Sequence, residues 1–244
     1  MADITGISWT DSTFNPWWGC SKVGPGCDHC YAEALDRRTG GDYWGPTKTP
    51  RVMSPENWRQ PSRWQRKAEA TGMRHRVFCG SMCDWTDKNG PAGQRERLWD
   101  LIRATPSLDW QLLTKRAPNI ARCLPADWGD GYKNVWLGVT VENRKHGLPR
   151  IEHLRRIPAK VRFLSIEPLL EDLGELDLTG IHWVIVGGES GSHARPMEAA
   201  WMSNIWRQCE AAGVAFFFKQ WGGRRDKGGC LIDGIELKQF PAAA

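Results

Sequence analysis

Residues 135–168 read VWLGVTVENRKHGLPRIEHLRRIPAKVRFLSIEP, and this stretch contains one complete strand–helix–strand unit. It begins and ends with apolar runs, Val135–Val141 and Val161–Ile166, whose Val, Ile, Phe and Trp content is typical of strands. Between the runs, apolar residues recur at helical spacing from Leu148 to Ile157, and Pro158 ends that pattern. The stretch therefore predicts two parallel strands joined by a helix.

The same unit recurs along the whole chain. An early strand at Thr13–Trp18 and a helix at Asp28–Arg38 supply a first unit, and Pro91 and Pro196 open two more predicted helices. The proline-rich segment Gly40–Pro61 is predicted to be a long loop excursion. The remaining predicted strands are Arg76–Ser81, Asp109–Thr114, Trp183–Val186 and Val214–Lys219. This alternation predicts one α/β domain over residues 1–244, a parallel β/α barrel that is full or partial.

The composition is that of an ordinary soluble globular protein. Charged residues make up 25% of the 244 residues and the hydrophobic set 41%, which excludes a disordered chain. The longest apolar run, Val214–Phe218, is far shorter than a membrane span requires. The first ten residues lack a basic start and an apolar stretch, so no signal peptide is expected and the predicted location is the cytoplasm.

Cysteine, tryptophan and charge are the unusual features. Eight cysteines in a cytoplasmic chain indicate metal or redox chemistry rather than disulfides, because that compartment keeps thiols reduced. Fifteen tryptophans, against three tyrosines, accompany a net charge of +5. Guanidinium groups pair with phosphate and indoles stack on bases, so this combination is typical of nucleotide or nucleic-acid binding. The alternative is that many of these tryptophans are simply core residues.

Charged side chains follow the predicted strands at their carboxyl ends, where parallel β/α barrels carry their chemistry. Single residues of this kind are also common as helix caps and in solvated loops. A ring contributed by six consecutive strands favours a functional site. The ring consists of Asp84, Lys115, Glu142, Glu167, Glu189 and Lys219.

Three cysteines in the loop after the first predicted strand, Cys20-x6-Cys27-x2-Cys30, form the sharpest motif. Three thiolates can hold a [4Fe–4S] cluster and leave one iron open, whereas a cluster that only transfers electrons takes four. Tetrahedral zinc is an alternative that requires a fourth protein ligand. A third alternative is a set of inert thiols. The candidates for a fourth zinc ligand are His29, Cys79 and Cys83.

Several motifs together resemble those of a known superfamily. Three cysteines after the first strand of a parallel β/α barrel are similar to the radical SAM superfamily. The chain resembles more closely a phage and bacterial protein family of radical-SAM type, over nearly the whole sequence. The resemblance rests on Trp18-Gly19-Cys20, Gly26-Cys27-Asp28-His29-Cys30-Tyr31-Ala32, Thr114-Lys115-Arg116, Gly138-Val139-Thr140-Val141-Glu142, Ser165-Ile166-Glu167-Pro168-Leu169, Gly187-Gly188-Glu189-Ser190-Gly191, Ala194-Arg195-Pro196 and Phe218-Lys219-Gln220-Trp221-Gly222.

The resemblance implies a partial (β/α)6-type parallel TIM-like barrel with an additional C-terminal strand. It implies a [4Fe–4S] cluster on Cys20, Cys27 and Cys30, whose open iron chelates the amino and carboxylate groups of S-adenosylmethionine. It also implies that the reduced cluster cleaves the C–S bond, so that a 5′-deoxyadenosyl radical abstracts hydrogen from a substrate. Such an enzyme requires a flavodoxin- or ferredoxin-type reductant as its partner.

The resemblance also assigns residues that bind S-adenosylmethionine. His29 stands where the superfamily often places a side chain near adenine, and Ser81 and Asp84 follow the second strand, where the amino group is bound. The chain departs from the superfamily in two ways: its first cysteine spacing is six rather than three residues, and its literal Gly187-Gly188-Glu189 lies on a later strand. The remaining predicted contacts are Thr140, Glu142 and Ser165 for ribose and carboxylate, and Gly187 and Gly188 for close backbone approach to adenine or substrate.

The mouth of the barrel is predicted to bind a phosphate-bearing substrate, because basic side chains surround it. Trp85 and Trp221 follow strand ends, where their indoles can stack on a base. A nucleotide fits these features, and so does a base flipped out of DNA or RNA, which predicts nucleic-acid modification or repair. Substrate contacts are predicted for Lys115, Arg116, Glu167, Glu189, Arg195, Lys219 and Trp221.

Two other function classes remain as alternatives. A metal-dependent barrel hydrolase would use the four ring carboxylates with His146 or His193 around divalent ions. A zinc-stapled nucleic-acid-binding protein without catalysis would use the three cysteines to hold its N-terminal loop and would bind in a salt-sensitive manner. The first leaves the cysteines without a role, and the second leaves the carboxylate ring without one. An enzyme that keeps the cluster but has lost turnover is a further alternative.

Overall fold

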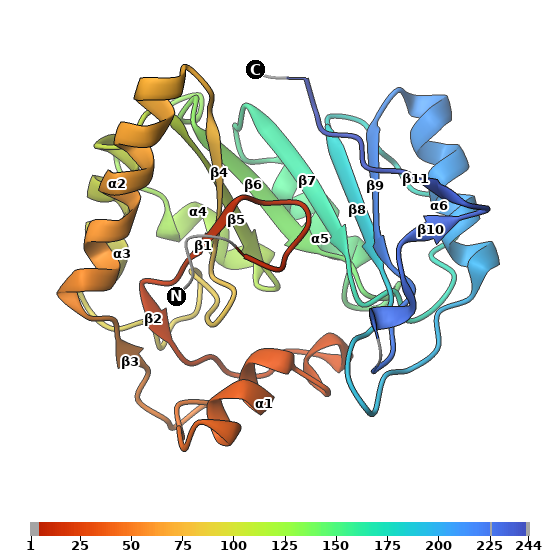
Figure 1. Ribbon diagram of the computed structural model, residues 1–244, viewed down its shortest axis with the longest axis horizontal. Helices are drawn as coiled ribbons and strands as arrows, with labels where there is room; N and C mark the ends of the chain where they lie inside the picture. The colour runs from red at the N-terminus through yellow and green to blue at the C-terminus, as the bar shows by residue number, and fades with distance from the viewer. Residues whose placement is uncertain (1–4, 225, 243–244) are drawn as a thin grey trace.

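The computed structural model describes residues 5–224 and 226–242, which fold into a curled α/β half-barrel (Figure 1). Its seven-stranded sheet is parallel, and the strands lie side by side in chain order. The strands are β1 (Ser12–Phe14), β4 (His75–Cys79), β5 (Leu108–Thr114), β6 (Val135–Thr140), β7 (Val161–Ile166), β8 (Trp183–Gly187) and β9 (Ala215–Gln220). The predicted fold class, a partial TIM-like barrel, is confirmed.

The early strand predicted at Thr13–Trp18 is divided in the structure. β1 pairs with β4 in the main sheet, while β2 (Trp17–Trp18) pairs antiparallel with β3 (Arg51–Val52) in a separate ribbon. Pro16 has no N–H to donate to a sheet ladder. The side-chain oxygen of Asn15 accepts instead from the N–H of Met82 at 2.7 Å, so the chain leaves the main sheet at this point.

Helices flank the sheet along its length. In Figure 1, α2 stands beside β4 and β5, α6 stands beside β9, and α1 lies at the bottom of the view. The described part of the chain contains no helix long and apolar enough to cross a membrane. The α-helices are α1 (Tyr31–Arg38), α2 (Pro55–Thr71), α3 (Gln94–Arg103), α4 (Ile120–Cys123), α5 (Leu148–Arg155) and α6 (Ala199–Ala212). The 3₁₀ turns are η1 (Pro25–Cys27), η2 (Ala117–Asn119) and η3 (Asp226–Gly228). A hairpin of β10 (Leu231–Ile232) and β11 (Ile235–Glu236) follows η3.

The loop excursion predicted over residues 40–61 contains two regular elements, the short strand β3 and the first part of α2, which begins at Pro55. The Ser54 hydroxyl caps α2 by accepting from the N–H of Asn57 at 3.4 Å. Pro55 begins the helix, where its missing N–H costs nothing, but Pro61 lies inside it. The helix forms despite Pro61 because its inner face buries two tryptophans against the core.

Two layers of buried apolar side chains lie on opposite faces of the sheet. Along β7, for example, Leu164 faces the helices and Phe163 faces the inside of the half-barrel. The inner layer is largely aromatic, and Trp183 packs edge-on against Trp136 and Phe217 at centroid distances of 5.8 and 6.0 Å. This layer fills the interior of the half-barrel below the carboxyl ends of the strands.

Most tryptophans are core residues. This confirms the alternative explanation of the high tryptophan content, in which the indoles pack in the core and do not bind bases. Trp85, predicted to stack on a base, is 0% exposed and packs edge-on against Trp99. The high tryptophan content therefore carries little information about ligands. The buried tryptophans are Trp9, Trp17, Trp58, Trp64, Trp85, Trp99, Trp110, Trp128, Trp136 and Trp183.

Candidate functional site

A cavity of about 420 Å³ opens at the carboxyl ends of the strands. Its wall is formed by residues at the ends of β4 to β9 and by the loop that carries the three cysteines. The structure thus brings most of the predicted site residues to one place. Those in the wall are Cys20, Cys27, His29, Cys30, Ser81, Asp84, Lys115, Arg116, Thr140, Ser165, Glu167, Glu189 and Lys219.

The other predicted site residues lie outside this wall, and their contacts with a cofactor or substrate stay predictions. A Cβ on Gly188 would lie 1.9 Å from the carbonyl oxygen of Trp221, so this glycine permits the packing of two strand ends. Trp221 donates its indole N–H to the carbonyl of Leu231 at 2.9 Å. The residues outside the wall are Glu142, Gly187, Gly188, Arg195 and Trp221.

The three cysteines belong to an irregular loop between β2 and α1. Cys27 ends the turn η1, and Cys30 is the N-cap residue of α1. The loop enters the mouth of the half-barrel where the N–H of Gly19 donates to the carbonyl of Met82 at 3.1 Å. All three cysteines line the cavity, and none of the cysteines in the described ranges forms a disulfide.

The cysteines match an iron–sulfur cluster in ligand type and number. Thiolates are the usual protein ligands of such clusters, and three of them leave one iron open. In residues 5–224 and 226–242, however, no group of three His, Cys, Asp or Glu side chains is arranged to hold a metal ion. A cluster would therefore have to draw the three thiols together. The loop could allow such a movement because, between β2 and α1, it contains one regular element, the 3₁₀ turn η1.

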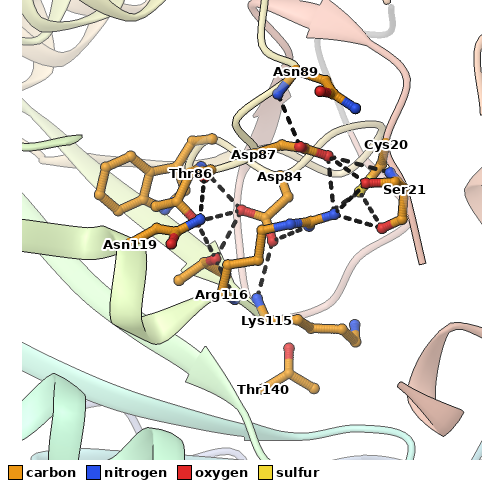
Figure 2. A network of polar contacts seen from close by, with 12 residues as sticks. Cys20, Ser21, Asp84, Thr86, Asp87, Asn89, Lys115, Arg116, Asn119 and Thr140 are labelled. Carbon is orange, nitrogen blue, oxygen red and sulfur yellow. Dashed lines mark hydrogen bonds and ion pairs between the residues drawn. The ribbon is translucent and has the colours of Figure 1, made fainter. Parts of the chain in front are cut away.

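An arginine that follows β5 holds one end of the cysteine loop (Figure 2). The Arg116 guanidinium pairs with Asp84 and Asp87, each at 2.9 Å, and donates to the carbonyl and hydroxyl of Ser21 at 2.5 and 2.8 Å. It also donates to Sγ of Cys20 at 3.4 Å. Its side chain is only 10% exposed, so these charge-assisted hydrogen bonds are shielded from bulk water. The charge of Arg116 is thus engaged within the protein.

Asp84 is the centre of this network. Its Oδ1 accepts from the N–H and hydroxyl of Thr86 and from the hydroxyl of Thr114, and its Oδ2 accepts from the N–H of Lys115 and from Arg116. Burial alone would raise the pKa of the Asp84 carboxyl, but Arg116 and the other donors hold it below its ordinary value. A carboxylate offers about four lone-pair sites. Contact with the amino group of S-adenosylmethionine would therefore require displacement of one of these donors.

A second arginine holds the other end of the loop. Arg195 follows β8 and donates to the carbonyl of Pro25 at 2.8 Å. Glu189 anchors it by accepting from Nη2 at 2.5 Å and Nε at 2.9 Å, and Glu189 also contacts Nδ1 of His29 at 2.9 Å. Burial disfavours ionisation of Glu189, but the hydrogen bonds from Arg195 and His29 outweigh it and lower its pKa to about 2. Residues that follow β5 and β8 thus fix the loop at both ends.

Glu142 lies beneath the loop and is fully buried. It pairs with Arg150 of α5 at 2.5 Å, and Arg150 also donates to the carbonyl of Thr140 at 2.7 Å. A Cβ on Gly26 would lie 3.0 Å from the Glu142 side chain, so glycine permits the loop to approach this closely. Glu142 therefore supports the loop from below, with its charge already matched by Arg150.

In the part of the chain that the structure describes, two lysines of the cavity wall lack the ion pairs that the other charged residues of the wall have. Lys219, for comparison, pairs with Glu167 at 2.5 Å. Lys115 and Lys227 also line the cavity, and neither ammonium group has an ion-pair partner among the described residues. Figure 2 shows the Lys115 side chain extending away from the Arg116 network. These two ammonium groups are available to an anionic ligand.

The sequence-based prediction missed part of the wall. Trp44 lines the cavity because the N–H of Gly45 donates to the carbonyl of Cys20 at 2.9 Å, which holds this segment against the cysteine loop. Lys227 reaches the cavity from the loop after β9. Both residues lie outside the predicted strands, so strand periodicity carries no signal for either. A tryptophan within a proline-rich loop was the one available signal for Trp44.

These features define an α/β half-barrel whose carboxyl-end mouth carries a cysteine-bearing loop over a cavity. The chain belongs to the family described as "Protein of unknown function (DUF5131)", whose model matches residues 4–241. The curated proteins contain no match to it.

A solved structure of spore photoproduct lyase is similar to this chain, with a TM-score of 0.47 and 13% sequence identity. That structure is of a double mutant with bound AdoMet and dinucleoside spore photoproduct. The similarity covers 80% of this chain and 60% of the lyase chain, so this chain spans less than two thirds of the lyase.

Proposed function

We propose that this protein is a radical S-adenosylmethionine enzyme that acts on a nucleotide or a nucleic acid. In this proposal Cys20, Cys27 and Cys30 hold a [4Fe–4S] cluster. The observation that carries the proposal is the convergence of these three cysteines on one cavity at the carboxyl-end mouth of the half-barrel. The sequence motifs that resemble the radical SAM superfamily support the same conclusion.

When bound, the reduced cluster supplies the electron that cleaves S-adenosylmethionine and so allows hydrogen abstraction from the substrate. The residues of this chain position and enclose that chemistry. Thr140 and Ser165 are register partners on β6 and β7, and both line the cavity. Their adjacent hydroxyls would bind the ribose or carboxylate of one ligand. His29, oriented by Glu189, would pack near the adenine.

The free charges in the wall support an anionic substrate. The ammonium groups of Lys115 and Lys227 would bind phosphate oxygens, because in the described residues neither is already paired with a carboxylate. Trp44, from the same wall, offers an indole for stacking on a base. A nucleotide, or a base extruded from a nucleic acid, combines these two chemistries.

Anaerobic reconstitution with iron and sulfide tests the proposal. We expect about four irons per chain and release of 5′-deoxyadenosine from S-adenosylmethionine after reduction. Cys27→Ala should lose both properties. Cys230→Ala is the matched control and should keep both, because Cys230 is not part of the cavity wall. A colourless protein that holds one zinc and leaves S-adenosylmethionine intact would contradict the proposal.

A further inference from the structure

The three thiols of the cysteine loop have different surroundings. Nη1 of Arg116 lies 3.4 Å from Sγ of Cys20 and 2.9 Å from Oδ2 of Asp84. Within the part of the chain that the structure describes, the sulfurs of Cys27 and Cys30 have no comparable charged donor. Cys20 is thus distinguished from the other two by a guanidinium at its sulfur.

Two buried carboxylates keep this guanidinium in place. Oδ2 of Asp87, a residue 2% exposed, pairs with Nη2 of Arg116 at 2.9 Å. The same oxygen accepts from the N–H and the hydroxyl of Ser21, each at 3.2 Å. Asp84 is in turn held by donors on both of its oxygens. Turning the guanidinium toward a ligand in the cavity would break buried ion pairs, which is costly because the partner charges would stay desolvated.

We propose that Arg116 is a positioning residue that raises the reduction potential of the cluster through its hydrogen bond to the Cys20 sulfur, and that Asp87 lowers it. This inference rests on the proposed function. Reduction adds negative charge to the cluster, so a positively charged donor at a ligating sulfur favours the reduced form. A carboxylate nearby disfavours the reduced form. The network in Figure 2 therefore sets the potential by the balance of these opposing charges.

Redox titration of the reconstituted protein, without S-adenosylmethionine, measures this effect. We expect Arg116→Gln to lower the equilibrium constant for reduction about tenfold, which is a shift of about 59 mV to lower potential for one electron. Asp87→Asn should shift the potential upward, and Arg116→Lys should lie between wild type and Arg116→Gln. Arg122→Gln, a change of an exposed arginine on α4, should leave the potential unchanged. Shifts of the same sign for Arg116→Gln and Asp87→Asn, or no shift, would overturn the inference.

Amide hydrogen exchange on the cluster-free chain tests the positioning role separately. Arg116→Gln should speed exchange of the Ser21 amide, which donates to Asp87, by about tenfold. The Cys27 amide donates to the carbonyl of Gly24 at 2.9 Å and should be unaffected. Unchanged exchange at Ser21 would overturn the positioning role. A chain that binds no cluster would refute the proposed function and leave this exchange result valid.

Discussion

Single residues at the mouth of the half-barrel mostly neutralise one another. Glu142 binds Arg150, Glu189 binds Arg195, and the Arg116 guanidinium lies between two carboxylates. A buried charge is costly unless it is paired, so the buried carboxylates of the strand-end ring are satisfied internally even without a ligand. Three of them, Asp84, Glu142 and Glu189, have arginine partners and help to hold the cysteine loop. The hydroxyls of the wall, and the lysines that have no ion-pair partner among the described residues, are left to meet a ligand.

The lowered pKa of Glu189 makes a testable contribution to stability. Its pKa falls from 4.5 to about 2 in the folded chain, so the stabilisation is fully present above pH 4.5 and is lost as the pH falls toward 2. We expect Glu189→Gln to lower the free energy of unfolding by about 2 kcal/mol near neutral pH. Urea denaturation across this range should show the difference from wild type shrinking with acidification. A difference that is constant with pH would contradict this account of Glu189.

Residue identity at the strand ends could be predicted from the sequence, but the pairing of the side chains could not. Parallel strands bring their carboxyl ends to one edge, so Asp84, Glu167 and Lys219 were expected at one mouth and line one cavity. The partners Arg150 and Arg195 come from a helix and from an irregular loop. Their directions depend on tertiary packing, which leaves no periodic signal in the sequence.

Among the elements, the cysteine loop depends on its neighbours for its position. β5 fixes it through Arg116, β8 through Glu189 and Arg195, and β6 supports it through Glu142. The segment with Trp44 lies against it from another side. Contacts from several strands thus place an irregular loop, whose regular structure is the turn η1, at a defined site.

The buried pair between Glu142 and Arg150 joins α5 to the end of β6. Arg150→Met should lower the free energy of unfolding by about 3–5 kcal/mol, because it leaves the fully buried Glu142 carboxylate without its partner. The double change Glu142→Leu/Arg150→Met should recover much of that loss. Arg156→Met is the control, because Arg156 is the exposed C-cap residue of α5 and has no ion pair among the described residues, and it should cost at most about 1 kcal/mol. Equal losses for Arg150→Met and Arg156→Met in urea denaturation would argue against this role.

Strands were predicted more accurately than the segments between β1 and β4. The apolar runs of β6 and β8 are nearly continuous because both faces of a parallel sheet are covered, and this leaves a clear signal. The helix α2 was not predicted, because Pro55 and Pro61 favour a loop, whereas the burial of Trp58 and Trp64 outweighs Pro61 in the folded chain. Local propensity and tertiary packing disagree at that helix.

At the scale of the whole molecule, the open half-barrel exposes a cavity whose unpaired charges, among the residues that the structure describes, are positive. We expect Lys115→Ala/Lys227→Ala to weaken nucleotide or oligonucleotide binding at low salt and to reduce the slope of log affinity against log salt by about two. Lys160→Ala, just before the amino end of β7, is the control and should change neither quantity. Fluorescence anisotropy with labelled DNA, RNA and nucleotides measures both. Unchanged binding in the double variant would exclude these lysines as the phosphate contacts.

Electron paramagnetic resonance of the reduced, reconstituted protein, with and without S-adenosylmethionine, tests the central claim most directly. If Cys20, Cys27 and Cys30 hold a cluster with one open iron, the signal should change when S-adenosylmethionine is added. Cys27→Ala should show no such change, and Cys230→Ala should behave as wild type. A cluster signal that S-adenosylmethionine leaves unaltered, or a wild-type chain with no cluster signal, would contradict the account.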